Sequence, residues 1–230
     1  MHLLYVSMTR KERNMGLGLL ALMLFSILLF PSRTAPLGEF LFYGGYFIEA
    51  LIIFRQFLRA SLEVPLIPFP TVLKFALLGY ALSFLANLLT NDLIYYFLPK
   101  YFSFDETGPH FVNLCKIHMG ALASVNFPLT AVVVVLFVPL VEELLYRGVV
   151  FGNLLQKNHP LAYVISTLLY CLVLTAPILG QYPADYVILS FIQYIPINLM
   201  FCWIYTRTET VLTPILAHMV MNGISIFTMR

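Results

Sequence analysis

Long apolar stretches make up most of the chain and are separated by short polar or charged segments. A helix of about 20 apolar residues crosses a hydrocarbon core of about 30 Å, so each stretch predicts a transmembrane helix. About seven spans are expected, at residues 15–31, 40–54, 73–91, 127–147, 160–178, 185–205 and 211–228. The longest connection, residues 92–126, is expected to carry a short amphipathic helix in its second half. No internal repeat is visible, so residues 1–230 are predicted to form a single integral membrane domain.

Composition supports an all-α polytopic membrane helix bundle. The chain is 60% hydrophobic and 10% charged, whereas a soluble domain usually carries about 25% charged residues. Three cysteines without a CxxC pair favour neither a disulfide framework nor a metal site. No basic run or interleaving of aromatic and basic residues indicates nucleic-acid binding.

The basic residues near the apolar stretches predict an orientation. One set falls on the same side of the predicted spans: Arg10, Lys11, Arg13, Arg55, Arg59, Lys74, Lys157 and Arg207. The other side receives only a thin scatter: Arg33, Lys100, Lys116 and Arg230. By the positive-inside rule the N-terminus is cytoplasmic and the C-terminus lies outside. The first apolar run resembles a signal peptide, but the segment PSRTAPLG that follows is a poor cleavage site, so a retained span is expected.

The segment VPLVEELLYRG places charges inside the fourth predicted span. An ionisable side chain there costs roughly 2.5–3.5 kcal/mol on insertion scales and so indicates a functional site. Glu143 and Arg147 are spaced i and i+4 and can pair on one helix face. Glu142 points about 100° away and lacks that partner, so it is the freer carboxylate and a candidate general base. The alternative is an ion-paired helix end in the headgroup region, with Arg147 extending towards the lipid surface.

A second polar pair lies in the last predicted span, in the segment TVLTPILAHMVMNGISIF. His218 and Asn222 are four residues apart and share one helix face. Directed at one point, a histidine and an amide can polarise a carbonyl and stabilise an oxyanion. The alternative is a hydrogen bond between helices, worth roughly 0.6 kcal/mol on average.

Together, EExxxR in one span and HxxxN in a late span resemble the CAAX protease and bacteriocin-processing family of intramembrane peptidases. The flanking segments VEELLYRGVVFGNL and WIYTRTETVLTPILAHMVMN are similar as well. The likeness extends over residues 138–222, and the family-like core is expected at about residues 127–228. The resemblance implies an intramembrane endopeptidase with a role for each of these residues. Glu142 would activate a water, Glu143 and Arg147 would support the site, and His218 and Asn222 would stabilise the oxyanion.

The resemblance further implies a substrate and a location. The substrate would be a peptide or membrane protein delivered through the lipid bilayer, and the location a bacterial plasma membrane. Bacteriocin immunity or peptide processing is favoured over cleavage of a prenylated CAAX protein.

One part of the family pattern is missing. The middle motif, FxxxH, corresponds to a stretch with Tyr170 at the aromatic position and Leu174 at the histidine position. The alternative function is therefore a catalytically impaired member that regulates or scaffolds a membrane partner, such as a sensor kinase. A small transporter is less favoured, because the polar residues gather near one side and do not line a path across the membrane.

No cofactor is predicted. A catalytic zinc site usually takes three protein ligands and a water. Only Glu142, Glu143 and His218 can converge here, so zinc is a weaker hypothesis than a metal-free glutamate mechanism.

Overall fold

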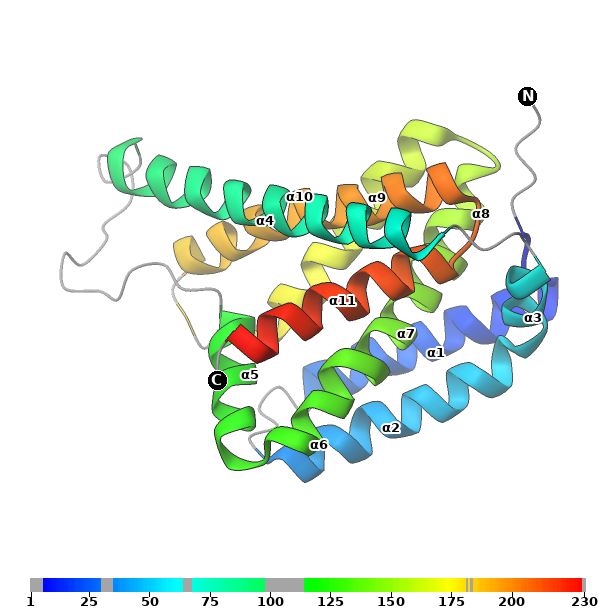
Figure 1. The fold of residues 1–230 in the computed structure, drawn as a ribbon, viewed down its shortest axis with the longest axis horizontal. Helices are drawn as coiled ribbons and strands as arrows, with labels where there is room; N and C mark the ends of the chain where they lie inside the picture. The colour runs from blue at the N-terminus through cyan, green and yellow to red at the C-terminus, as the bar shows by residue number, and fades with distance from the viewer. Residues whose placement is uncertain are drawn as a thin grey trace.

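The computed structural model describes residues 6–29, 35–63, 68–97, 114–180, 182 and 184–228, and within them the chain is almost wholly helical (Figure 1). The helices are α1 Arg10–Leu29, α2 Pro36–Ile53, α3 Arg55–Glu63, α4 Phe69–Phe97, α5 Leu114–Val125, α6 Phe127–Val132, η1 Val133–Phe137, α7 Val138–Glu143, η2 Leu144–Phe151, α8 Gly152–Leu155, α9 His159–Thr175, η3 Ala176–Ile178, α10 Ala184–Thr208 and α11 Leu212–Thr228.

Six helices in the described part of the chain are long and apolar enough to cross a membrane, and α11 is a shorter apolar helix. The all-α polytopic bundle predicted from the apolar pattern is therefore confirmed. α4 extends to Phe97, beyond the predicted end at residue 91. The short helix expected in the long connection is present as α5, while residues 98–113 of that connection lie outside the described residues.

Residues 127–155 form one continuous helix composed of α6, η1, α7, η2 and α8. It begins where the Asn126 side chain accepts a hydrogen bond from the Leu129 N–H, with a proline in the first turn. In its most apolar window 56% of the residues are buried, against 18–44% for the other five candidate spans. This central helix is therefore the element around which the others pack.

Pro139 lies inside the central helix without ending it. Proline lacks an N–H and clashes with the carbonyl four residues earlier in a regular α-helix. The preceding turn, η1, is π-helical, and the Val138 N–H bonds the carbonyl of Val133 five residues back. The wider turn accommodates the ring, at the cost of local irregularity in the hydrogen-bond ladder.

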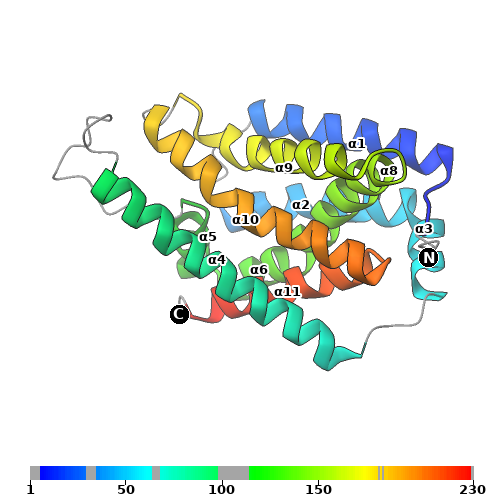
Figure 2. The same ribbon diagram turned by 90° about the horizontal axis from the view of Figure 1, so that it is seen from above.

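The other helices surround the central one. α1 and α2 pack against it on one side, and α9, α10 and α11 also contact it. α4 packs on α10 and α11 and lies outside them, as Figure 2 shows. Large apolar side chains on α4 face outward, among them Leu78, Phe84 and Leu89, which is expected of a surface in contact with lipid.

One end of the bundle carries most of the basic residues. α1 begins at Arg10, α3 at Arg55, and α10 has Arg207 in its last turn. The start of α1, α3, α8 and the junction of α10 with α11 all lie at the right of Figures 1 and 2. The basic residues thus share one end, and the assignment of that end to the cytoplasm stays a prediction.

Glu12 joins α1 to α3 at this end. Its Oε2 accepts hydrogen bonds from the Thr9 N–H at 3.0 Å and the Thr9 hydroxyl at 2.8 Å. Its Oε1 accepts the Phe57 N–H at 2.8 Å, one of the amides at the start of a helix that has no partner within that helix. A carboxylate also interacts favourably with the positive end of a helix dipole, so Glu12 fixes where α3 docks.

Candidate active site

Glu142, Glu143 and Arg147 lie in the interior of the central helix, where α7 passes into η2. Glu142 is 5% exposed, and Glu143 and Arg147 are 0% exposed. The helix continues past Arg147 to Leu155, so the predicted end at residue 147 is wrong. Because the charge of Arg147 is neutralised inside the bundle, the helix does not need to end there. The alternative interpretation, a helix end with Arg147 extended towards the lipid surface, is wrong on both points, because the helix continues and Arg147 is buried.

Glu143 connects the central helix to α11. Its Oε2 lies 3.0 Å from Arg147 Nε, the i and i+4 pair that the spacing indicates. Its Oε1 lies 2.9 Å from Nδ1 of His218, 75 residues later in the chain. A carboxylate only accepts hydrogen bonds, so Nδ1 of His218 carries the proton and donates it. Nε2 is then the His218 ring nitrogen that Glu143 leaves for other partners.

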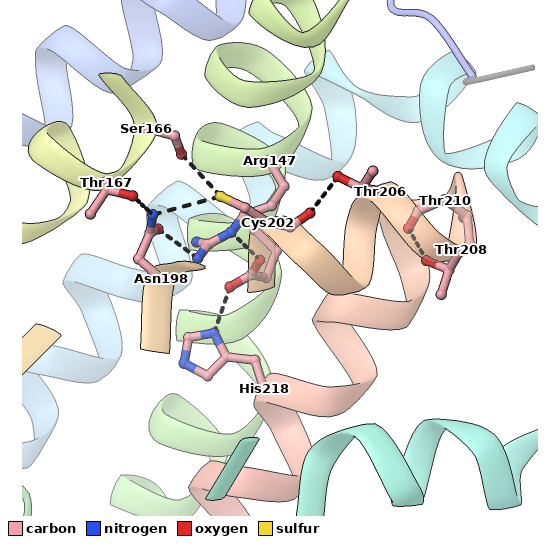
Figure 3. Close-up of polar contacts among 10 residues, drawn as sticks. Arg147, Ser166, Thr167, Asn198, Cys202, Thr206, Thr208, Thr210 and His218 are labelled. Atoms are coloured by element: carbon pink, nitrogen blue, oxygen red, sulfur yellow. Dashed lines mark hydrogen bonds and ion pairs between the residues drawn. The ribbon is translucent and has the colours of Figure 1, made fainter. Parts of the chain in front are cut away.

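Arg147 has a further partner on α10. Its Nη2 donates to Oδ1 of Asn198 at 2.7 Å, and Nδ2 of Asn198 donates to the Thr167 hydroxyl on α9 at 2.9 Å. Asn198 also contacts the Cys202 sulfur at 3.6 Å. Figure 3 shows Asn198 and Cys202 of α10 beside the Arg147 guanidinium, with Thr167 of α9 behind Asn198 in the same hydrogen-bond network. A chain of hydrogen bonds and one ion pair therefore runs from α9 through α10 and the central helix to α11.

Aromatic rings enclose the charged groups. The guanidinium carbon of Arg147 lies 4.9 Å from the centre of the Phe201 ring and 5.0 Å from that of Tyr170. The Phe201 ring is in turn 4.9 Å from the His218 ring. A desolvated guanidinium over an aromatic face gains about 2 kcal/mol or more. The rings both stabilise the cation and exclude water from its far side.

Glu142 is the carboxylate left without a committed partner. In the described part of the chain it makes no hydrogen bond or ion pair, whereas Glu143 makes both. It nevertheless lies within electrostatic range of His218, Glu143 and Arg147. The structure thus separates the two adjacent glutamates into one that is bound on both oxygens and one that is free.

Asn222 lies one turn after His218 on α11, but its amide is bound elsewhere. Nδ2 donates to the main-chain carbonyl of Val134 at 2.8 Å. That carbonyl needs a donor, because the Val138 N–H bonds Val133 and Pro139 has no N–H. Asn222 therefore fills a gap in the ladder that Pro139 creates. One of its two amide hydrogens remains for another acceptor.

The position of the missing motif histidine contains no substitute that titrates. Leu174 is partly buried against the main apolar core. The hydroxyl of Thr175 donates to the main-chain carbonyl of Cys171 at 2.8 Å and is used within its own helix. Tyr170, at the aromatic position of the motif, is 4% exposed and packs edge-on against Tyr146 with ring centres 5.2 Å apart.

The sequence patterns overlooked two participants, Asn198 and Thr167. Both are buried polar residues within apolar helices, and Asn198 stands in the run YIPINLMF. A polar side chain in such a run needs a partner inside the bundle. That argument alone could have flagged Asn198, but it could not have identified Arg147 as the partner.

No group of three or more His, Cys, Asp or Glu side chains is arranged to hold a metal ion among the residues that the structure describes. The cluster instead has two carboxylates, one guanidinium, one imidazole and two amides. This donor set suits proton transfer and hydrogen bonding to a polar substrate.

Comparison with known proteins defines the class to which this site belongs. Residues 124–224 match the family model described as "Type II CAAX prenyl endopeptidase Rce1-like". The matched region contains all five predicted site residues: Glu142, Glu143, Arg147, His218 and Asn222. The C-terminal part of the chain is therefore similar to CAAX-type membrane peptidases, and the resemblance seen in the sequence is confirmed.

Two curated bacterial proteins are similar to this chain. The "Putative membrane peptidase YdiL" of Bacillus subtilis (strain 168) is 30% identical over 96 residues, which are 41% of this chain and 35% of that protein. The "UPF0177 protein YxdF" of Lactococcus lactis subsp. lactis (strain IL1403) is 33% identical over 87 residues, 38% of this chain and 42% of that protein. The chain thus matches less than half the length of either relative. No solved structure matches.

Proposed function

We propose that the chain is an intramembrane endopeptidase in which Glu142 activates a water to hydrolyse a peptide bond. The observation that carries the proposal is the convergence of four ionisable side chains, Glu142, Glu143, Arg147 and His218, from two helices in the interior of the bundle. A purely structural ion pair would need only one carboxylate for Arg147. The second, unpartnered carboxylate costs free energy on burial unless it has a function.

The charges of the four groups suit the role. With Arg147 positive and Glu143 negative, one proton shared between Glu142 and His218 leaves the cluster neutral in total. Glu142 ionised with His218 protonated, and Glu142 protonated with His218 neutral, have the same net charge. A proton can therefore leave water for Glu142 and later reach the amine leaving group without building up net charge in an apolar interior.

His218 has a defined orientation for this chemistry. Its Nδ1 is held by Glu143 at 2.9 Å, so Nε2 is the nitrogen available to the substrate. In the protonated ring Nε2 donates a hydrogen bond to the carbonyl oxygen that becomes negative when water attacks the carbonyl carbon. The free amide hydrogen of Asn222 is proposed as a second donor, while its other hydrogen stays on the Val134 carbonyl.

The proposed substrate is a peptide or membrane protein that reaches the site through the bilayer. The proposed setting is a bacterial plasma membrane with the N-terminus in the cytoplasm. Apolar helix surfaces such as that of α4 face outward, and the cluster lies within the bundle between them. Both features suit a substrate with an apolar segment, such as a bacteriocin or a precursor peptide.

The test is a cleavage assay on the purified chain in lipid vesicles, with a mixture of lipid-anchored and unanchored peptides and mass spectrometry of the products. Wild type is expected to release fragments, and Glu142→Gln and His218→Gln are each expected to lower the rate by about 10²–10⁴-fold. Tyr163→Phe, which removes a hydrogen bond to Thr206 outside the cluster, serves as the control with unchanged rate. Equal cleavage by wild type and both site variants would overturn the proposal.

A second candidate is a non-catalytic membrane regulator that binds a partner such as a sensor kinase. The observation that favours it is Leu174, an apolar side chain packed in the core where the family motif has a histidine. This candidate predicts that Glu142→Gln keeps the biological effect. Substitutions on the outward face of α4, such as Phe84→Ser, would abolish it by removing partner contacts.

A further inference from the structure

We propose that Asn198 is a positioning residue of this site: it orients the Arg147 guanidinium so that Glu143 meets both Arg147 and His218. The proposal rests on the proposed peptidase function for its effect on catalysis. Its effect on geometry can be measured without any cleavage. Asn198 lies outside both motifs that carry the family resemblance.

The first support is the hydrogen bonding of Arg147. In the described part of the chain Nη1 has no hydrogen-bond partner, and Nε has only the ion pair with Glu143. The bond from Nη2 to Oδ1 of Asn198, at 2.7 Å, is thus the hydrogen bond that fixes the rotation of the guanidinium plane. The rings of Phe201 and Tyr170 lie 4.9 Å and 5.0 Å from the guanidinium carbon, and no hydrogen bond joins either residue to Arg147 among the described residues.

The second support is that Asn198 is itself fixed. It is 0% exposed, and its Nδ2 donates to the Thr167 hydroxyl at 2.9 Å. Arg147 can only donate, so the carboxamide oxygen faces Arg147 and Nδ2 faces the Thr167 hydroxyl, which holds the other end of the carboxamide in place. α9 and α10 therefore act as a rigid frame that presents one carbonyl oxygen to the central helix.

The consequence for His218 follows from Glu143. The Glu143 carboxylate is shared between Arg147 Nε at 3.0 Å and His218 Nδ1 at 2.9 Å. If the guanidinium rotates, Oε2 loses its partner and the carboxylate turns, which changes the direction in which the His218 ring points. A displacement of about 1 Å at a reacting group can lower a rate by about 10²-fold.

The structure also provides a matched control for the loss of a helix-to-helix hydrogen bond. Tyr163 and Thr206 form such a bond at 3.0 Å between the same two helices, α9 and α10. Among the described residues, neither makes a hydrogen bond or ion pair with Glu142, Glu143, Arg147 or His218. Tyr163→Phe thus removes one hydrogen bond between α9 and α10 without changing the contacts of Arg147.

The kinetic experiment compares Asn198→Leu, Asn198→Asp, Thr167→Val and Tyr163→Phe in vesicles, with the peptide that wild type cleaves. Asn198→Leu is expected to lower kcat by about 10- to 100-fold with KM changed by no more than about twofold. Asn198→Asp keeps an acceptor for Arg147 and can accept from Thr167 but adds a buried negative charge, so its loss of kcat should be smaller than that of Asn198→Leu. Thr167→Val should give a smaller loss than Asn198→Leu, and Tyr163→Phe none.

The structural experiment uses 15N-histidine labelling and the ring-nitrogen signals of His218, which are assigned by their loss in His218→Gln. Asn198→Leu is expected to shift these signals, and Tyr163→Phe is expected to leave them unchanged. Unchanged His218 signals in both Asn198→Leu and Thr167→Val would overturn the proposal. If wild type cleaves nothing but Asn198→Leu still shifts the signals, the peptidase function fails and the positioning role stands.

Discussion

Two buried carboxylates in this bundle, Glu12 and Glu143, meet their hydrogen-bonding needs in different ways. Glu12 is bound by two main-chain amides and a threonine hydroxyl at one end of the molecule. Glu143 is bound by two ionisable side chains, Arg147 and His218, in the interior. Among the described residues, no other buried carboxylate is adjacent to Glu12 in the sequence, whereas Glu143 directly follows the unpartnered Glu142.

The difference separates a structural carboxylate from a candidate reactive one. Main-chain donors do not change protonation state, so the Glu12 site can only hold the helices together. The Glu143 site contains a histidine and lies beside a second carboxylate, two residue types whose protonation state can change. Burial alone does not distinguish the two sites, since Glu12 and Glu142 are both 5% exposed. The nature of the partners does.

The largest effect is expected for Glu142→Gln. Loss of a general base should lower kcat for peptide cleavage by about 10²–10⁴-fold, while thermal unfolding in detergent should show stability that is unchanged or raised, because a buried carboxylate without a partner is removed. A marked loss of stability together with retained cleavage would show that Glu142, like Glu12, has a structural role only.

Arg147→Met should have the next largest effect. It leaves Glu143 as a buried charge without its cation, which costs about 3–5 kcal/mol of folding free energy. Arg207→Met is the control, because Arg207 is exposed and its guanidinium carbon lies 5.8 Å from the centre of the Trp203 ring, away from any buried carboxylate among the described residues. Denaturant unfolding in mixed micelles measures the unfolding free energy of both variants. A similar loss of unfolding free energy in Arg147→Met and Arg207→Met would contradict the interpretation of Glu143 and Arg147 as a buried ion pair.

Glu12→Ala should destabilise the protein without changing cleavage. It removes charge-assisted bonds to Thr9 and Phe57, and such bonds contribute about 1.5–3 kcal/mol. The expected signature is a lower unfolding temperature with kcat equal to wild type, measured at a temperature where both proteins are folded. A fall in kcat comparable to that of Glu142→Gln would remove the distinction between the two carboxylates.

The smallest effect is expected for Tyr146→Phe. The Tyr146 hydroxyl is buried and has no hydrogen-bond partner among the described residues, and removing a polar group that is not bonded to protein is close to neutral or slightly stabilising. The unfolding free energy should change by less than about 0.5 kcal/mol. A fall in the unfolding free energy of more than about 1 kcal/mol would show that the hydroxyl makes a hydrogen bond, and would add Tyr146 to the residues of the candidate site.

Much of the fold could be predicted because lipid imposes strict rules on sequence. A span must be apolar over about 20 residues and helical throughout, so the spans can be found from hydropathy alone. The end of the fourth span was placed at Arg147, eight residues before the helix ends at Leu155. The error arose because a charge usually marks a span end, and only the tertiary partners of Arg147 show that this one is buried.

The candidate site was partly predictable for a similar reason. Charges are rare in a span, so Glu142, Glu143 and Arg147 stand out, and helical spacing alone pairs Glu143 with Arg147. The roles of Glu142, His218 and Asn222 in catalysis stay predictions. The bond between Asn222 and Val134 was not foreseen, because it depends on how Pro139 disturbs the helix and on which carbonyl faces α11.

The sequence by itself determined the class of protein, the helical spans and the identity of the rare ionisable residues, since each follows from local composition and from the cost of polarity in lipid. Only the tertiary structure decided that Glu143 is the carboxylate shared with His218, that Asn198 holds Arg147, and that Glu142 is left free. These outcomes depend on which faces of helices far apart in sequence meet, and side-chain hydrogen bonds a few ångströms long are set by that packing.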